Sequence, residues 1–196
     1  MMRSSRSFGV PFAILILAAV CAARQDHEHH QPERYSREIA SYEIPDVTLV
    51  DMSGAKVSLR AALNYQGPVL LQFIFTTCPT VCPVMSEIFS SAQEKLGVEL
   101  DKIRMISISI DPEQDTPERL REYARRFNAR PQWSFLTGRL DDILAVQKAF
   151  DVYRGNKMRH EPITFLRASP REQWVRLNGL MSAAELVAEY RRLIAR

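Results

Sequence analysis

Two cysteines four positions apart, Cys78 and Cys82, are the residues of this sequence best suited to chemistry. They follow a continuous apolar run and precede a helical pattern that starts at Pro83, so we expect them where a buried strand meets a helix N-terminus. The free amides and the dipole of such a terminus favour the thiolate, which attacks disulfides and ligates metals. On one helical turn the two residues are separated by a rise of about 6 Å, which suits a disulfide and also two sulfurs directed at one ion. The spacing leaves redox chemistry and metal binding both open.

Three residues separate the cysteines, one more than in thioredoxins, and this moves the second sulfur further round the turn. That placement favours a shared metal over rapid attack of one sulfur on the other's mixed disulfide. Two thiolates are soft ligands for Cu(I), and an added imidazole gives a three-coordinate site that also holds Cu(II). His160 is the candidate imidazole, because the other three histidines lie within residues 24–40. A single histidine is also commonly a surface or core residue, so its presence alone does not make it a ligand.

Strand and helix patterns alternate along residues 41–196, which we expect to form one domain. A turn at Ser53-Gly54 predicts a hairpin over 47–59, and further strands are expected over 69–75, 103–110, 133–136, 163–166 and 174–177. Helices are expected over 83–97, after a Thr116 cap, after an Asp141 cap and after a Ser182/Glu185 capping box. This order predicts an α/β, thioredoxin-like fold, with a central mixed sheet flanked by helices and an N-terminal β-hairpin.

The first 40 residues have a different character. Arg3 and Arg6 precede an uncharged apolar run of about 16 residues, shorter than the roughly 20 that span a bilayer, so residues 1–23 are expected to be a signal peptide or a short N-terminal membrane anchor. Cys21 near the end of this run makes lipidation an alternative to an ordinary leader residue. Residues 24–40 are expected to be a tether that contributes no fold, with weak metal gathering by its histidines as the alternative. The domain is therefore expected to be exported, in the periplasm or another extracytoplasmic space.

Composition narrows the classes of partner. The chain has 196 residues and a net charge of +3, and its basic and acidic side chains alternate instead of forming a basic stripe. That pattern indicates solvated helix faces and argues against nucleic-acid binding. With 46% hydrophobic residues, the chain can bury one sizeable core, and we expect a monomer.

Three ordered motifs resemble the Sco/SenC family of copper chaperones for cytochrome c oxidase assembly. They are the cysteine segment 73–83, the segment 109–117 that contains Asp111, and His160 followed by Phe165-Leu166. The resemblance implies that Cys78, Cys82 and His160 bind copper, as Cu(I) or Cu(II). It implies an acidic role near the ligands for Asp111, which is otherwise the end of a strand before a turn. The implied partner is the copper-site subunit of a respiratory oxidase.

The sequence departs from the family pattern around His160. Arg159 stands where the family commonly has Asp before the ligand histidine, Thr80 stands where Asp is frequent, and the segment 153–160 is short. Fewer acidic groups lower the attraction of the site for a cation. Pro162, counted back from Phe165, matches the cis-proline of thioredoxin-like oxidoreductases, so a cis peptide bond between Glu161 and Pro162 is predicted.

Two functions fit these residues. The first is a metallochaperone, a binding protein rather than an enzyme, that holds copper and assists assembly of an oxidase copper site. The alternative is a thiol-disulfide oxidoreductase in which Cys78 and Cys82 are catalytic and reduce the cysteines of a copper-site partner. A purely structural disulfide explains the pair poorly, because so short a loop adds little stability through chain entropy. The sequence does not separate the first two functions, since both use the same cysteines.

Overall fold

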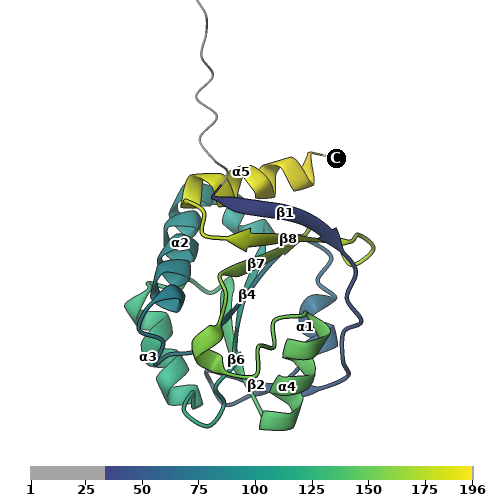
Figure 1. Ribbon diagram of the computed structural model, residues 1–196. Helices are drawn as coiled ribbons and strands as arrows, with labels where there is room; N and C mark the ends of the chain where they lie inside the picture. The colour runs from purple at the N-terminus through teal and green to yellow at the C-terminus, as the bar shows by residue number, and fades with distance from the viewer. Residues whose placement is uncertain (1–33, 196) are drawn as a thin grey trace, which may run out of the picture. The chain divides into compact units, whose positions relative to one another are not determined.

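The computed structural model describes residues 34–195 (Figure 1). Eight strands form one sheet in the order β1-β8-β7-β4-β5-β6-β2-β3. Their bounds are β1 Tyr35–Ala40, β2 Thr48–Asp51, β3 Lys56–Ser58, β4 Val69–Ile74, β5 Arg104–Ser109, β6 Trp133–Thr137, β7 Ile163–Arg167 and β8 Trp174–Gly179. β4, β5 and β6 are parallel to one another, whereas all other neighbours pair antiparallel. The predicted α/β class, the mixed sheet and the N-terminal hairpin of β2 and β3 are confirmed.

Helices cover both faces of the sheet. They are α1 Leu59–Leu63, α2 Val81–Leu96, α3 Pro117–Arg126, α4 Leu140–Ala149 and α5 Ala183–Ile194, with the short 3-10 helices η1 Gly97–Lys102 and η2 Lys157–Arg159. Figure 1 shows α2 and α3 on one side of the sheet and α1 and α4 on the other. No helix within residues 34–195 is long and apolar enough to cross a membrane.

Each face of the sheet packs its own apolar core. Leu70 and Phe135 belong to the core under α2, α3 and α5, while Leu71 and Phe73 belong to the core under α1 and α4. Successive strand residues point to opposite faces, so β4, which is apolar apart from Gln72, supplies both cores. Because both faces of β4 are packed in this way, the loop that follows β4 starts from a fixed position.

Two predicted helix starts differ from the structure. α2 begins at Val81, so Cys82 lies inside the helix and Pro83 occupies its first turn, where the missing amide hydrogen has no intrahelical partner to lose. α4 begins at Leu140 with Arg139 at the capping position, and Asp141 lies in the first turn instead of capping. An acidic residue such as Asp141 is favourable at the capping position and also in the first turn, because the helix dipole acts over the whole first turn. The Thr116 cap of α3 and the Ser182/Glu185 capping box of α5 are confirmed.

The predicted tether is wrong at its C-terminal end. Residues 24–40 were expected to lack folded structure, but Tyr35–Ala40 is the edge strand β1 and pairs along its whole length with β8. The Tyr35 hydroxyl and the Arg37 guanidinium also donate to the buried carboxylate of Glu189 on α5. These partners are more than 130 residues away in the chain, which is why a local charge pattern did not reveal the strand. The expectations for Cys21 and the leader fall outside the described residues.

Candidate metal and thiol site

The predicted site residues gather at one edge of the sheet. β4 and β5 are parallel, so the loops that follow them, carrying Cys78 and Asp111, leave the sheet at the same edge. β7 is antiparallel to β4, so the segment that enters it, carrying His160, lies at that edge too. The carboxyl ends of parallel strands are the usual place for a functional site in an open α/β sheet.

A tight turn delivers Cys78 to the N-terminus of α2. The amide of Cys78 donates to the carbonyl of Phe75 at 3.1 Å, which closes the turn directly after β4. The amide of Cys82, in the first turn of α2, donates to Cys78 Sγ at 3.4 Å. The capping residue Thr80 makes no side-chain capping bond to the helix. The sulfur of Cys78 therefore takes over the role that a capping oxygen usually has.

The two thiols differ in acidity. Burial acts to raise the pKa of Cys78, but hydrogen bonds from the amides of Cys82 and Thr80 and from their side chains outweigh it and lower that pKa. Burial raises the pKa of Cys82, and the neighbouring Cys78 raises it further. Both thiols are unbridged, with Cys78 slightly exposed and Cys82 fully buried. Cys78 is thus the more acidic thiol of the pair, and Cys82 is the less acidic one.

His160 is held by the backbone of β4. Its Nε2 atom lies 2.9 Å from the carbonyl oxygen of Phe73, and its ring packs edge-on near Phe75, with centroids 6.4 Å apart. Because a carbonyl only accepts, Nε2 carries the proton and Nδ1 keeps its lone pair. Burial lowers the pKa of His160, so the ring is neutral at physiological pH. A neutral imidazole with one nitrogen tied to a backbone carbonyl is the usual state of a metal-binding histidine.

The structure brings the two cysteines together but does not add His160 to them. Within the part of the chain that is described, no three acidic, cysteine or histidine side chains form a group that could hold a metal ion. His160 shares an edge of the sheet with the cysteines, and its Nε2 is committed to Phe73. The third predicted ligand therefore lies at the same edge of the sheet but is not grouped with the two sulfurs in this structure.

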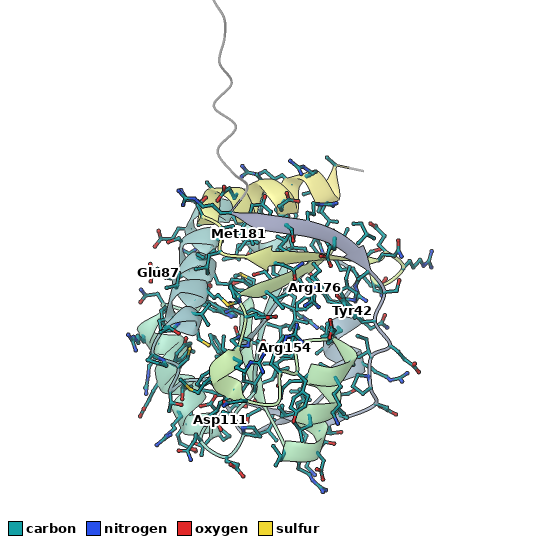
Figure 2. The ribbon with its side chains drawn as sticks, in the orientation of Figure 1. Tyr42, Glu87, Asp111, Arg154, Arg176 and Met181 are labelled. Atoms are coloured by element: carbon teal, nitrogen blue, oxygen red, sulfur yellow. The ribbon has the colours of Figure 1, made fainter. Side chains whose placement is uncertain are left out.

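Asp111 pairs with a residue that sequence reasoning did not consider. Its carboxylate accepts from Lys157 Nζ at 2.6 Å, and the Asp111 side chain is only 6% exposed. Lys157 opens η2, three residues before His160, so the ion pair ties the short segment 153–160 to the end of β5. The pair lines a cavity of about 510 Å³ together with His160 and Tyr153. Figure 2 labels Asp111 among the loops at the lower end of the sheet.

Asp115 is a second functional candidate that spacing alone did not single out. It lies in the 109–117 motif, is fully buried, and accepts hydrogen bonds from Thr76 and Ser109. Burial raises its pKa, while the bonds from Ser109 and Thr76 oppose that rise. The sequence did contain a signal, because Asp115 directly precedes the Thr116-Pro117 start of a helix, where an acidic side chain commonly accepts hydrogen bonds. The residues that donate these bonds depend on the fold.

The predicted cis-proline is wrong. Residues 34–195 contain no cis peptide bond, so Glu161 and Pro162 are joined in trans. The carbonyl of Pro162 accepts the amide of Gly179 at 2.8 Å, which continues the pairing of β7 with β8 into the preceding loop. The trans form is also the intrinsically preferred one. Pro162 therefore gives no support for oxidoreductase geometry.

Comparison with known proteins decides the family. The family model described as SCO1/SenC matches residues 39–195, which is most of the chain. The chain belongs to the SCO1/SenC family. The resemblance seen in its three sequence motifs is thereby confirmed, together with the thioredoxin-like fold of the family.

Several members of the family are similar to this chain. An SCO1 protein homologue of Bacillus subtilis is 39% identical over 100 residues, half of each chain. The structure of ScoI from Bradyrhizobium japonicum with copper bound is 28% identical, has a TM-score of 0.66 and covers 79% of this chain and 99% of its own. BsSco, a member of the Sco family of cytochrome c oxidase assembly proteins with an identified disulfide switch, is 27% identical with a TM-score of 0.66. It covers 80% of this chain and 95% of its own. The chain spans about half the length of the curated relatives that it matches.

Proposed function

We propose that this protein binds copper as its cargo and hands it to the copper-site subunit of a respiratory oxidase. The observation that carries the proposal is the pair of unbridged sulfurs at the start of α2, with Cys78 Sγ aligned on the amide of Cys82. Two soft sulfur donors in one helical turn suit Cu(I) better than any hard cation. The copper bound by ScoI of Bradyrhizobium japonicum and the assembly role of the Sco family support the same cargo and partner.

His160 is proposed as the third ligand, through Nδ1. The hydrogen bond to Phe73 keeps the proton on Nε2, and burial keeps the ring neutral, which leaves Nδ1 as the nitrogen able to bind a metal. An imidazole added to two thiolates widens the donor set so that Cu(II) is held as well as Cu(I). The ion pair of Lys157 with Asp111 holds the segment that carries His160 against the end of β5. Asp111 thus acts near the ligands through Lys157.

Thiol-disulfide exchange is the second candidate function. It is favoured by the unequal pKa values of Cys78 and Cys82, because an accessible thiolate above a buried thiol is the arrangement that attacks a disulfide and then resolves it. The disulfide switch identified in BsSco supports chemistry of this kind. The electrons in such a reaction come from the reduced cysteine pair, which is left as a disulfide while the partner's cystine is reduced to two thiols.

We propose that the protein works outside the cytoplasm as a monomer, with residues 1–23 as export signal or anchor and residues 24–34 as its link to the domain. An oxidising compartment suits a cysteine pair that must be kept reduced or metal-bound. Intact-mass analysis of the protein isolated from cell fractions tests the leader. A mass that lacks the leader indicates cleavage, and an added lipid on Cys21 indicates acylation. An intact N-terminus in the cytoplasmic fraction rejects export.

Copper titration of the full chain tests the function. The reduced protein, titrated anaerobically with Cu(I) and separately with Cu(II), is expected to bind both, and Cys78→Ser is expected to lose both. His160→Ala should lose Cu(II) and retain Cu(I) more weakly, whereas Arg159→Lys, the preceding residue with its charge kept, serves as the matched control. Unchanged Cu(II) affinity in the His160→Ala protein rejects His160 as a ligand. Reduction of oxidised glutathione, measured on the same proteins, is expected to survive in His160→Ala and to fail in Cys78→Ser.

A further inference from the structure

One buried carboxylate joins the ends of the two strands that carry the site. Asp115 is 0% exposed, and its two oxygens receive their hydrogen bonds from Thr76, just after β4, and from Ser109, the last residue of β5. No Lys, Arg or His within residues 34–195 forms an ion pair with it. A charge in such a place is costly unless hydrogen bonds replace the lost water. The fold buries the Asp115 carboxylate despite that cost, so we expect its hydrogen bonds to have a function.

On the β4 side Asp115 holds the turn that presents Cys78. The turn is closed by the bond from the Cys78 amide to the Phe75 carbonyl. The amide of Thr76, the residue after Phe75, has no partner inside this turn. That amide donates to Asp115 at 3.1 and 3.2 Å, and the Thr76 hydroxyl donates to the same carboxylate. Both polar hydrogens of Thr76 are therefore fixed, two residues before the reactive sulfur.

On the β5 side the same carboxylate reaches Asp111 through a hydroxyl. Ser109 Oγ donates to Asp115 Oδ2 at 2.6 Å and accepts from the amide of Asp111 at 3.0 Å. Ser109 is itself fully buried, so no water replaces either bond. A single side chain thus sets the distance between the cysteine turn and the start of the Asp111 loop.

We propose that Asp115 is a positioning residue for the cysteine pair, acting through Thr76 on the turn that carries Cys78. This inference rests on the proposed use of Cys78 and Cys82 as the reactive pair. A carboxylate is needed because all three donors, one amide and two hydroxyls, point at it, and the Ser109 hydroxyl already accepts from Asp111. An amide at position 115 places its own donor against one of these groups and shifts the turn.

Thr76 offers the matched pair of variants that tests the proposal. Thr76→Ser keeps the hydroxyl that donates to Asp115, whereas Thr76→Val keeps the shape and removes the hydroxyl. Asp115→Asn and Ser109→Ala test the other two groups. The measurement is the equilibrium constant for forming the Cys78–Cys82 disulfide against glutathione, because it reports how well the two sulfurs are placed in the folded protein. Melting temperatures are recorded beside it, so that loss of stability and loss of placement are told apart.

Thr76→Val and Asp115→Asn are expected to change this constant about three- to tenfold, the effect of one lost hydrogen bond of ordinary strength, while Thr76→Ser stays within about twofold of the parent. In the Asp115→Asn background, Thr76→Val should add nothing further. The same constant in Thr76→Val and in the parent, both folded, overturns the proposal, and so does an equal change in Thr76→Ser. If Asp115→Asn does not fold, the Thr76 pair carries the test.

Copper adds an independent readout. The sulfur-to-Cu(II) charge-transfer band is expected to shift in Thr76→Val and to remain in place in Thr76→Ser. If the parent protein binds no copper, the proposed cargo is wrong, but the disulfide constant still tests Asp115. If the parent binds copper and every variant matches it in both measurements, the copper proposal stands and the positioning role is rejected.

Discussion

The Nε2 atom of His160 lies 2.9 Å from the carbonyl oxygen of Phe73, a residue 87 positions earlier in the chain. This bond places the histidine beside the strand that leads to Cys78 and assigns the proton to Nε2. Burial of the ring lowers its pKa, and the bond to Phe73 offsets that shift only in part, so the ring is neutral. The bond is the structural reason to expect Nδ1 as the metal-binding nitrogen.

The burial of neutral His160 should make the stability of the metal-free protein depend on pH. In the unfolded chain the ring takes up a proton near its ordinary pKa of 6.5, while the folded protein resists protonation to lower pH. Below about 6.5 the unfolded state therefore binds more protons, and the free energy of unfolding falls as the pH falls. Denaturant unfolding over this range should show that loss in the parent protein. His160→Gln keeps a donor for Phe73 but cannot titrate, so an identical slope in this variant contradicts the assignment.

Cys78 should react with an alkylating agent before Cys82. Its pKa is lowered by the amides at the start of α2, while burial raises the pKa of Cys82, so we expect modification of Cys78 to be at least about tenfold faster. Peptide mapping after a brief treatment with iodoacetamide measures both sites and keeps Cys21 separate. Cys78→Ser is the control, and its Cys82 should react only after denaturation. Equal labelling of the two sites in the folded parent is inconsistent with the structure.

The ion pair of Lys157 with Asp111 should stabilise the fold measurably. Lys157→Met removes the charge at similar length and leaves a buried carboxylate without a donor, so we expect a loss of about 1–3 kcal/mol. Arg154→Met is the control, because Arg154 pairs with the exposed Glu161 and its loss should cost about 0–1 kcal/mol. Adding Asp111→Asn to Lys157→Met should recover part of the stability. Equal losses for Lys157→Met and Arg154→Met in denaturant unfolding would refute a special role for Asp111.

The capping box of α5 should contribute to stability above acidic pH. Ser182→Ala removes the cap and should cost about 1 kcal/mol. Bonds from Ser182 lower the pKa of Glu185 from 4.5, so its contribution is present above that value and is lost as the pH falls through the lower folded pKa. Glu185→Gln should flatten this acid dependence in thermal unfolding, whereas the exposed Glu94→Gln should not. A parent and a Glu185→Gln protein with the same acid profile would exclude the effect.

The sequence alone was sufficient for most of the elements and for the cysteine pair, but not for β1 or for the short helix α1. The continuous apolar run of β4, the Thr116 cap and the Ser182/Glu185 box are local signals, and they predicted the strands and helices within a few residues. The strand-to-helix junction at Cys78 follows from the same signals. Local patterns succeed here because dihedral preference, capping and hydrophobic period act over neighbouring residues.

Only the tertiary structure decided which distant residues meet. β1 forms because β8 and Glu189 complete its pairing, which overrides the charged sequence of the expected tether. Lys157 reaches Asp111 across 46 positions, and Asp115 reaches Thr76 across 39, because the parallel order of β4 and β5 brings their loops to one edge. Register and strand order depend on the whole sheet at once, and no short segment of sequence specifies them.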